Sequence, residues 1–224
     1  MNAPPDGRTP LIISRRNTLI LGAAAAAASF AGFGPARADD DVTIDPAKLM
    51  APTAIPDHVL GNKDSKVTLI EYGSATCPHC GRFHHDVYPL LKQKYIDSNK
   101  IAFIFRPFAL NVFDVVVFML ADIAGPDHYY NVIDTFYDNQ DKWVQSDKPK
   151  DAIMAIALQL GFTEDSFNQA LTNQDMANAV QKMRDQAVND FKVSGTPTFY
   201  LNGKQMVGEQ TIDDLSKAID PLLA

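Results

Sequence analysis

The tetrapeptide Cys77-Pro78-His79-Cys80 holds the only two cysteines of the 224-residue sequence. Two thiols separated by two residues can close a small disulfide and reopen it, which is redox chemistry. A thiol attacks a disulfide only as the thiolate, so one sulfur needs surroundings that stabilise negative charge. The free N–H groups and the positive dipole end of a helix that begins at Cys77 would provide them. Pro78 suits the first helical position, and His79 can donate a hydrogen bond or bring positive charge to the same sulfur.

A metal hairpin is the alternative use of such a cysteine pair. Structural zinc sites require four protein ligands, and the nearby candidates in the sequence are His79, His84 and His85. His84 stands seven residues after Cys77, about 10 Å along a helix axis, which is too far for both to hold one ion. The spacing therefore favours redox chemistry and predicts no metal site.

A buried strand and a helix are expected to position the two cysteines. Residues 67–72 form an apolar, β-branched run that leads into the motif, and residues 77–95 have the period of a helix. On a wheel of 100° per residue, Cys80 lies well inside the apolar arc and Cys77 at its edge. We therefore expect Cys77 to be the accessible thiol and Cys80 the sheltered one. The wheel assigns to the core face Cys80, Phe83, Val87, Leu90 and Leu91, and Arg82, His85 and Asp86 point away from it. His84 and His85 are interpreted as residues of the helix surface.

The rest of the chain predicts an α/β fold with a helical block between its two halves. Residues 101–105 form a second buried strand, parallel to the first because a helix connects the two. A β-hairpin is expected over residues 198–207, and Thr211 can cap a last helix. Residues 39–60 are polar and rich in proline, which predicts an extended lead-in with one edge strand. Helical patterns cover residues 112–124, 127–139, 150–160, a short stretch that opens at Thr163, and 173–190.

This order of elements resembles the DsbA family of bacterial disulfide oxidoreductases over most of residues 61–224. The motifs that carry the resemblance are the C-P-H-C tetrapeptide, Glu71 six residues before the first cysteine, and Thr196-Pro197. The resemblance implies a thioredoxin-like fold with a helical domain inserted at about residues 110–190. It also implies thiol–disulfide oxidoreductase activity without a bound cofactor.

The resemblance gives roles to residues outside the cysteine motif. In the family, the proline that matches Pro197 is cis and lies against the disulfide, where its loop pairs with an extended substrate peptide. Family oxidases often carry valine before it, whereas threonine, as in Thr196, is more usual in isomerases and reductases. The acid that matches Glu71 is buried and moves protons to or from the sheltered cysteine, here Cys80. From the sequence alone, Pro197 could instead open a strand, and Glu71 could be a strand-end carboxylate paired with Lys66.

Residues 1–38 have the pattern of an export signal. Three arginines precede the apolar run of residues 19–33, and the Pro-Ala-Arg-Ala sequence of residues 35–38 offers a cleavage site before Asp39. The run is too short and too rich in alanine for a spanning helix, although a short membrane anchor is the alternative. Residues 14–19 resemble a twin-arginine signal except at Thr18, so the twin-arginine and the general secretory routes both remain open.

The mature chain would be acidic. Residues 1–38 hold four arginines and one aspartate, so the 20 basic and 27 acidic residues fall to 16 and 26, a net charge of −10. Such a protein should repel nucleic acid and anionic membrane surfaces. Its 186 residues suit a single domain with a sizeable core. A disulfide that spans two residues ties down almost no chain, so the cysteine pair must matter for its reactivity.

Together these patterns predict a monomeric periplasmic oxidase that donates its Cys77–Cys80 disulfide to reduced or misoxidised exported proteins. A membrane oxidase of the DsbB type, which the resemblance implies, would restore the disulfide. One alternative is an isomerase or reductase of the same fold. Such relatives usually dimerise through an N-terminal segment, and residues 39–60 look too short for one. The other alternative is a periplasmic copper- or peptide-binding protein that uses the cysteines with Met176 or Met183.

Overall fold

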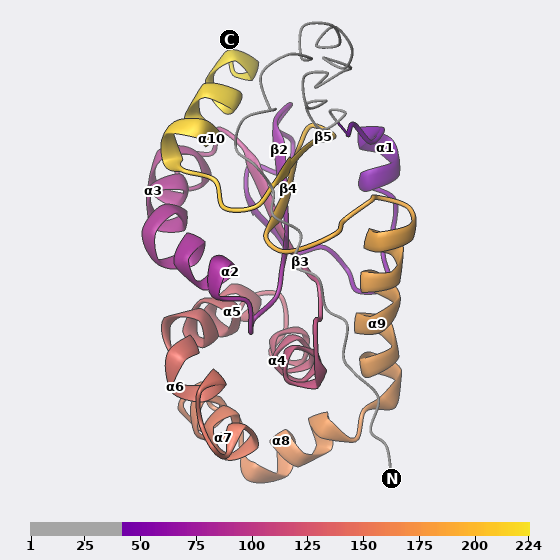
Figure 1. Cartoon of the computed structure of the whole chain (residues 1–224), viewed down its shortest axis with the longest axis vertical. Helices are drawn as coiled ribbons and strands as arrows, with labels where there is room; N and C mark the ends of the chain where they lie inside the picture. Colours follow the sequence, from indigo (N-terminus) through magenta and orange to yellow (C-terminus); the bar gives the residue numbers. More distant parts are fainter. Residues whose placement is uncertain (1–41) are drawn as a thin grey trace, which may run out of the picture. The chain divides into compact units, whose positions relative to one another are not determined.

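A five-stranded mixed sheet in the order β1-β3-β2-β4-β5 forms the framework of the computed structural model, which describes residues 42–224 (Figure 1). The strands are β1 (Val59–Gly61), β2 (Thr68–Gly73), β3 (Ala102–Pro107), β4 (Thr198–Leu201) and β5 (Lys204–Val207). Strands β2 and β3 are parallel, and the other neighbouring pairs are antiparallel. The parallel pair and the β4–β5 hairpin confirm the predicted α/β fold. The expected export signal lies outside the described residues.

Helices cover both faces of the sheet and form a block between β3 and β4 (Figure 1). Helices α2, α3 and α10 lie on one face, and α1 and α9 on the other. The helices are α1 (Pro46–Leu49), α2 (Pro78–Arg82), α3 (Tyr88–Leu91), α4 (Val112–Ile123), α5 (Tyr129–Asp138), α6 (Gln140–Val144), α7 (Pro149–Gln159), α8 (Glu164–Leu171), α9 (Gln174–Asn189) and α10 (Ile212–Ile219), followed by a 3₁₀ turn at Asp220–Leu222. Within residues 42–224, none of them is long and apolar enough to cross a bilayer.

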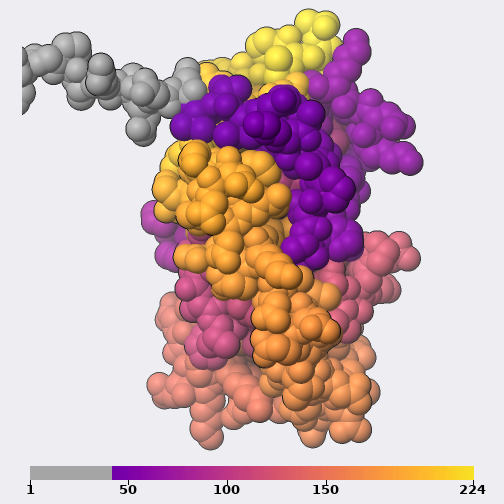
Figure 2. Space-filling model, turned by 90° about the vertical axis from the view of Figure 1, so that its right-hand side faces the viewer, coloured from indigo at the N-terminus to yellow at the C-terminus, as the bar shows by residue number. Residues whose placement is uncertain are grey.

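The N-terminal segment packs on the face of the sheet that carries α9. Leu49 of α1 belongs to a buried cluster with Ile70 of β2, Tyr200 of β4 and Phe191, which follows α9. In Figure 2 the indigo N-terminal segment lies directly against the orange residues of α9 and of the stretch after it. The sequence predicts an edge strand in this segment, which β1 provides, but it does not predict α1.

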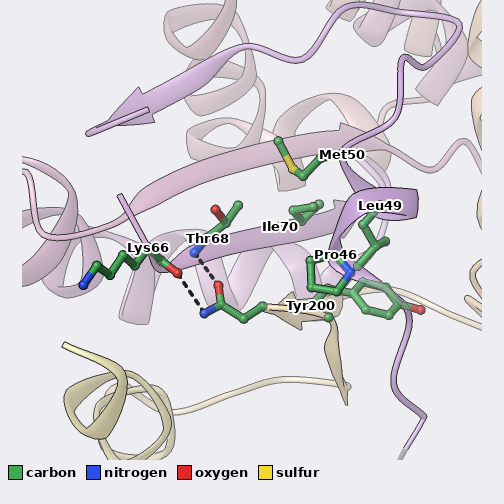
Figure 3. Close-up of a pocket in the computed structure, with 9 residues that line it drawn as sticks. Pro46, Leu49, Met50, Lys66, Thr68, Ile70 and Tyr200 are labelled. Carbon is green, nitrogen blue, oxygen red and sulfur yellow. Dashed lines mark hydrogen bonds between the residues drawn. The ribbon is translucent and has the colours of Figure 1, made fainter. Parts of the chain in front are cut away.

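A pocket of about 220 Å³ opens where α1 covers the sheet (Figure 3). Pro46 and Leu49 of α1 line it together with Thr68 and Ile70 of β2. At the start of β2, Asn202 accepts a hydrogen bond from the Thr68 backbone N–H and donates one to the Lys66 carbonyl. The residues that line the pocket include neither cysteine nor any residue of the Thr196-Pro197 loop. This pocket is therefore distinct from the redox motif.

The helix that follows the cysteines is not a regular α-helix. Its turns at Phe83–Val87 and Lys92–Ile96 are π-helical, and between them α3 contains Pro89. A proline inside a helix has no N–H to donate and crowds the carbonyl four residues earlier, so a wider turn ahead of it relieves the conflict. The wide turn changes the phase of the following residues. The prediction that Leu90 lies in the core is therefore wrong, because Leu90 is 46% exposed, whereas Leu91 is buried as expected.

Several helices begin at capping residues that the sequence shows. Asn111 accepts hydrogen bonds from the first N–H groups of α4, and Thr163 and Ser166 form a reciprocal capping box at α8. Thr211 accepts from the backbone N–H of Asp214 at the start of α10, as expected. The short helix α6 was not predicted. It matters because its first residue, Gln140, reaches the cysteine motif.

Candidate active site

Cys77 and Cys80 lie where β2 gives way to α2. Cys77 is the N-cap residue of α2, with Pro78 at the first helical position, and Cys80 lies one turn further on. Both are free thiols in this structure. Cys77 is 6% exposed and Cys80 is fully buried. The order of accessibility from the helical wheel agrees with this burial, although the rim position of Cys77 is itself well covered.

The surroundings of Cys77 favour its thiolate. The pKa of the thiol is lowered from 9.0 to about 5, chiefly by a hydrogen bond from the Cys80 side chain. Burial opposes this shift, while the Thr196 side chain and the backbone N–H groups of Cys80 and His79 add to it. The two N–H groups belong to the first turn of the helix, where they have no partner inside the helix. Cys77 is therefore a thiolate near neutral pH.

The surroundings of Cys80 favour the neutral thiol. Burial is the largest cause that raises the pKa of Cys80 well above its ordinary value of 9.0. The Cys77 sulfur and the negative charge of Glu71 raise it further. When Cys80 acts as a nucleophile or a leaving group, it must lose or gain a proton in a buried place.

The loop Thr196-Pro197 lies against the reactive sulfur. The peptide bond between these residues is cis, as the family resemblance implies. The Cys77 thiol donates a hydrogen bond to the carbonyl oxygen of Thr196 at 3.3 Å. The Thr196 hydroxyl is buried and makes no hydrogen bond of ordinary geometry to any described residue, although its proximity helps to lower the pKa of Cys77. The loop therefore offers both an acceptor to the thiol and a hydroxyl to the thiolate.

The His79 side chain contacts a carboxylate on the protein surface. Its ring and the guanidinium of Arg82 both contact the carboxylate of Glu209, in the loop between β5 and α10. The pKa of Glu209 is lowered, first by the hydrogen bond from Arg82 and then by that from His79. The backbone N–H of His79, rather than its ring, is the part that lowers the pKa of Cys77. The sequence did not indicate Glu209, which is distant in the chain and lies in no motif.

Three helices of the inserted block hold the loop that precedes Cys77. Asp114 of α4 accepts hydrogen bonds from Ser74 Oγ at 2.8 Å and from the Thr76 backbone N–H at 2.7 Å. Tyr137 of α5 donates to the Ser74 carbonyl at 3.1 Å. Gln140 of α6 donates to the Ala75 and Cys77 carbonyls at 2.7 and 3.0 Å. The inserted block thus fixes the backbone that presents the thiol.

None of these three residues is among the site residues that the sequence predicts. Asp114 had a visible signal, because it is an acidic residue inside an otherwise apolar helix and is fully buried. Burial raises its pKa, while the hydrogen bonds it accepts lower it. Gln140 and Tyr137 carried no comparable signal, since polar and aromatic residues at such positions are common on helices.

Glu71 and His84 are buried next to each other beneath the cysteines. Glu71 is fully buried, and its Oε2 lies 3.3 Å from Nε2 of His84. The proposed pairing with Lys66 is therefore not found, and Lys66 is exposed. The prediction that His84 lies on the helix surface is wrong, because His84 is only 6% exposed and stacks on Tyr137 at 4.0 Å. It follows Cys80 by four residues, which places both side chains on the same face of the helix. His85 is exposed as expected.

No group of three or more His, Cys, Asp or Glu side chains in residues 42–224 is arranged to hold a metal ion. A pocket of about 450 Å³ adjoins the start of α2 on the side of the inserted block. It is lined by Pro78, Gly81, Arg82, His85, Asp138, Asn139, Gln140, Asp141 and Lys142. The surface beside the start of α2 is therefore hollowed on this side, and most of the residues that line the hollow have polar or charged side chains.

The chain is similar to known proteins over most of its length. The family model described as thioredoxin matches residues 53–221. A protein of Rickettsia felis, whose name gives protein-disulfide oxidoreductase as its inferred activity, is 35% identical over 84% of this chain and 68% of its own length. Across five Rickettsia relatives, the chain spans between 60% and 68% of their length.

Solved structures give the same relationship. Alpha-DsbA1 of Wolbachia pipientis superimposes with a TM-score of 0.73 and 26% identity, over 80% of this chain and 96% of that one. BdbD of Bacillus subtilis has a TM-score of 0.69 over 83% of this chain and 99% of its own, and at 21% identity it supports the fold alone. By the family match, the relatives and the geometry of its cysteine pair, the chain belongs to the thioredoxin family, in the DsbA-like group of thiol–disulfide oxidoreductases.

Proposed function

We propose that the protein is an exported thiol oxidase whose Cys77–Cys80 disulfide passes to reduced proteins outside the cytoplasm. A substrate thiolate attacks Cys77, the Cys77–Cys80 bond breaks, and a mixed disulfide with the substrate forms. A second substrate thiolate then attacks the substrate sulfur of that bond. The oxidised substrate leaves, and Cys77 and Cys80 remain reduced. A membrane oxidase of the DsbB type would then take the two electrons and restore the disulfide.

One observation carries the oxidase direction. The pKa of Cys77 is lowered to about 5 by hydrogen bonds that only the reduced thiolate can use in full. Interactions that stabilise the thiolate favour the reduced form, so they make the disulfide a stronger oxidant. A stabilised thiolate is also a good leaving group when a substrate thiol attacks.

The other predicted site residues have roles around this pair. Pro197 and Thr196 would align an extended substrate peptide beside Cys77 through the backbone of their loop. Pro78 begins the helix without the loss of a backbone donor. Glu71 would accept and return the proton of Cys80. His79 would act through its charge and through its contact with Glu209.

Export rests on the sequence pattern of residues 1–38, and the periplasm is the compartment in which such a disulfide is useful. Mass spectrometry of the protein recovered from the periplasm of an expressing bacterium should find a chain that begins near Asp39. Recovery of the full-length chain in the membrane fraction would support the anchor instead.

The reduction potential of the pair tests the direction of electron flow. Equilibration of the purified protein with glutathione buffers should give a potential well above that of thioredoxin, about −270 mV. The protein should also oxidise a reduced, unfolded substrate faster than it rescues a scrambled one. A potential near the thioredoxin value would overturn the oxidase function and favour a reductase.

An isomerase is the second candidate, because Thr196 precedes the cis proline and its buried hydroxyl lies close to the sulfur. Thr196→Val separates the candidates, since it removes one hydrogen-bond donor and leaves the rest of the site in place. For an oxidase, the potential should fall only modestly, because the other stabilising contacts of Cys77 remain. The copper-binding alternative gains little support, because Met183 is buried in the hydrophobic core, where Met176 packs against it.

A further inference from the structure

A line of ionisable side chains runs from beneath Cys80 toward the protein surface. Glu71 of β2 is fully buried, and its charge raises the pKa of Cys80. Nε2 of His84 lies 3.3 Å from Oε2 of Glu71. The other ring nitrogen of His84, Nδ1, lies 3.8 Å from Oδ1 of Asp134 in α5. The imidazole ring therefore stands between a buried carboxylate and a carboxylate whose side chain is 38% exposed.

None of these contacts has the geometry of a hydrogen bond. Both carboxylate oxygens of Glu71, both ring nitrogens of His84 and Oδ1 of Asp134 are buried and have no hydrogen-bond partner among the described residues. Buried polar atoms in proteins are nearly always paired, and unpaired ones are costly. These adjacent buried atoms without hydrogen-bond partners lower the stability of the fold, so their arrangement needs another explanation.

The ring of His84 is held so that its two nitrogens face the two carboxylates. It stacks on Tyr137 at 4.0 Å with an interplanar angle of 19°, and Tyr88 packs on it with centroids 4.8 Å apart. A pocket of about 200 Å³ opens on its outer side. The pocket is lined by His84, Tyr88, Pro89, Lys92, Asp134 and Asp138. A proton that leaves Nδ1 can therefore reach solvent through Asp134.

We propose that His84 carries the proton of Cys80 between Glu71 and Asp134, so that the buried thiol exchanges protons with solvent through this line. The proposal deepens the proposed function, because it rests on the roles given there to Cys80 and Glu71. His84 touches neither sulfur nor substrate in this scheme. It acts on Cys80 only through Glu71.

The path of each proton and electron pair can be followed when glutathione disulfide oxidises the reduced enzyme. The Cys77 thiolate attacks the disulfide, forms a mixed disulfide and releases one glutathione thiolate. The Cys80 thiol gives its proton to Glu71 and attacks the Cys77 sulfur, and the electron pair of the broken bond leaves on the second glutathione sulfur. Glu71 passes its proton to Nε2 of His84, while Nδ1 releases its own proton to Asp134 and then to water.

The charged groups around the ring suit this transfer. The pKa of Asp134 is raised to about 6, with burial as the largest cause; His84 and Lys92 lower it, and Asp138 and Glu71 raise it. An acid with such a pKa exchanges protons readily near neutral pH. The tyrosines that pack on the ring stay neutral, because burial raises the pKa values of Tyr88 and Tyr137.

The test separates the two steps of oxidation by glutathione disulfide in stopped-flow experiments. Formation of the mixed disulfide needs only Cys77, whereas its closure needs Cys80 to lose a proton. His84→Gln should slow closure about tenfold or more near neutral pH and change its pH profile, while it leaves the first step within about twofold. Asp134→Asn should slow closure in the same direction. His85→Gln, which changes the exposed neighbour of His84, should alter neither step.

A rescue experiment separates proton transfer from packing. His84→Ala leaves space beside the outer pocket, so added imidazole should restore the rate of closure in the folded variant. Closure of His84→Gln within about twofold of wild type across the pH range would overturn the proposal. Slow closure in His84→Ala that imidazole leaves unchanged would overturn it too. In both cases the wild-type protein still reacts with glutathione disulfide, so only the role of His84 is overturned. If the wild-type protein itself fails to react with glutathione disulfide, the proposed function is overturned instead.

Discussion

At the scale of single residues, the two sulfurs have opposite charge preferences although they are three residues apart. Hydrogen bonds from the Cys80 side chain and the first helical turn lower the pKa of Cys77 to about 5. Burial raises the pKa of Cys80 well above 9.0. Each thiol also shifts the other, because Cys80 donates to Cys77. Only Cys77 is therefore ready to exchange with an incoming disulfide or to leave from one.

Substitution of each cysteine should reveal this division. Cys80→Ser should trap mixed disulfides between Cys77 and substrate proteins, because no second enzyme thiol remains to resolve them. Cys77→Ser should trap few, since Cys80 is buried and neutral. Non-reducing electrophoresis followed by mass spectrometry measures both. Faster alkylation of Cys80 than of Cys77 in the reduced protein at mildly acidic pH would reverse the assignment.

Glu209 should determine how strongly the positive charge of Arg82 acts on Cys77. Its carboxylate contacts the His79 ring and pairs with the guanidinium of Arg82, whose charge interacts with Cys77. Glu209→Gln should therefore lower the pKa of Cys77 below its wild-type value and make the disulfide more oxidising. The pH dependence of alkylation by iodoacetamide gives the pKa, and the effect should weaken in high salt because these groups are exposed. The exposed Glu164→Gln on α8 serves as the control, and a rise in the pKa of Cys77 would contradict the prediction.

The residues that the sequence predicted are those with a local signature. The cysteine spacing and Pro78 could be identified from neighbours in the chain, and Pro197 from the family resemblance. Glu209 could not, because its partners lie 127 and 130 residues away in sequence. His84 was misplaced because a polar residue on a helix was assigned to solvent, although its spacing of four from Cys80 placed it on the buried face.

At the scale of secondary-structure elements, the stretch before Cys77 depends on helices that are remote in the sequence. Asp114 accepts hydrogen bonds from Ser74, Thr76 and the Leu110 backbone N–H. Gly81 makes room for the neighbouring contact, since a Cβ at this position would lie 2.2 Å from the Gln140 side-chain oxygen. The glycine thus permits the close approach of α6 to the start of α2.

Removal of the carboxylate of Asp114 should loosen this stretch. Asp114→Ala leaves several buried donors unpaired, so the free energy of unfolding should fall by about 3 kcal/mol. The reactivity of Cys77 should change as well, because its backbone support is lost. Urea denaturation measures the first effect and alkylation kinetics the second. Asp127→Ala, at an exposed position just before α5, should cost less than about 0.5 kcal/mol. Equal losses in the two variants would contradict this role.

Several helix boundaries follow from capping residues that the sequence shows. Thr163, Asn173 and Thr211 each cap the helix that the sequence placed after them. The phase within the helix after Cys77 did not follow, because two π-helical turns interrupt the regular period. Helix α6 escaped prediction since it has only five residues and lacks a side-chain cap.

At the scale of the whole molecule, the redox state should change stability in a pH-dependent way. The pKa of Cys77 is about 5 in the folded reduced protein and 9.0 ordinarily. Because the folded pKa is lowered, the stabilisation is complete above the unfolded pKa and is lost as the pH falls through about 5. The disulfide form has no thiol to titrate and serves as the reference.

The difference in unfolding free energy between the reduced and disulfide forms should therefore shift in favour of the reduced form as the pH rises from 5 toward 9. Urea denaturation of both forms at several pH values measures this difference. The reduced Cys77→Ser variant has no thiol at position 77. Its unfolding free energy should therefore not rise in this way above the value measured for the same variant at pH 5. A difference that is flat in the wild type, or that falls with rising pH, would contradict the lowered pKa of Cys77.

The three attachments of the inserted block to the cysteine loop have a consequence for heat inactivation. Asp114, Tyr137 and Gln140 come from three different helices, so partial melting of any one of them releases part of the loop. Local opening generally needs less free energy than global unfolding. On warming, turnover should therefore fade at temperatures where amide exchange in β2 and β3 is still slow, and cooling should restore it. Local melting of the helical block would then switch off catalysis reversibly before the sheet unfolds.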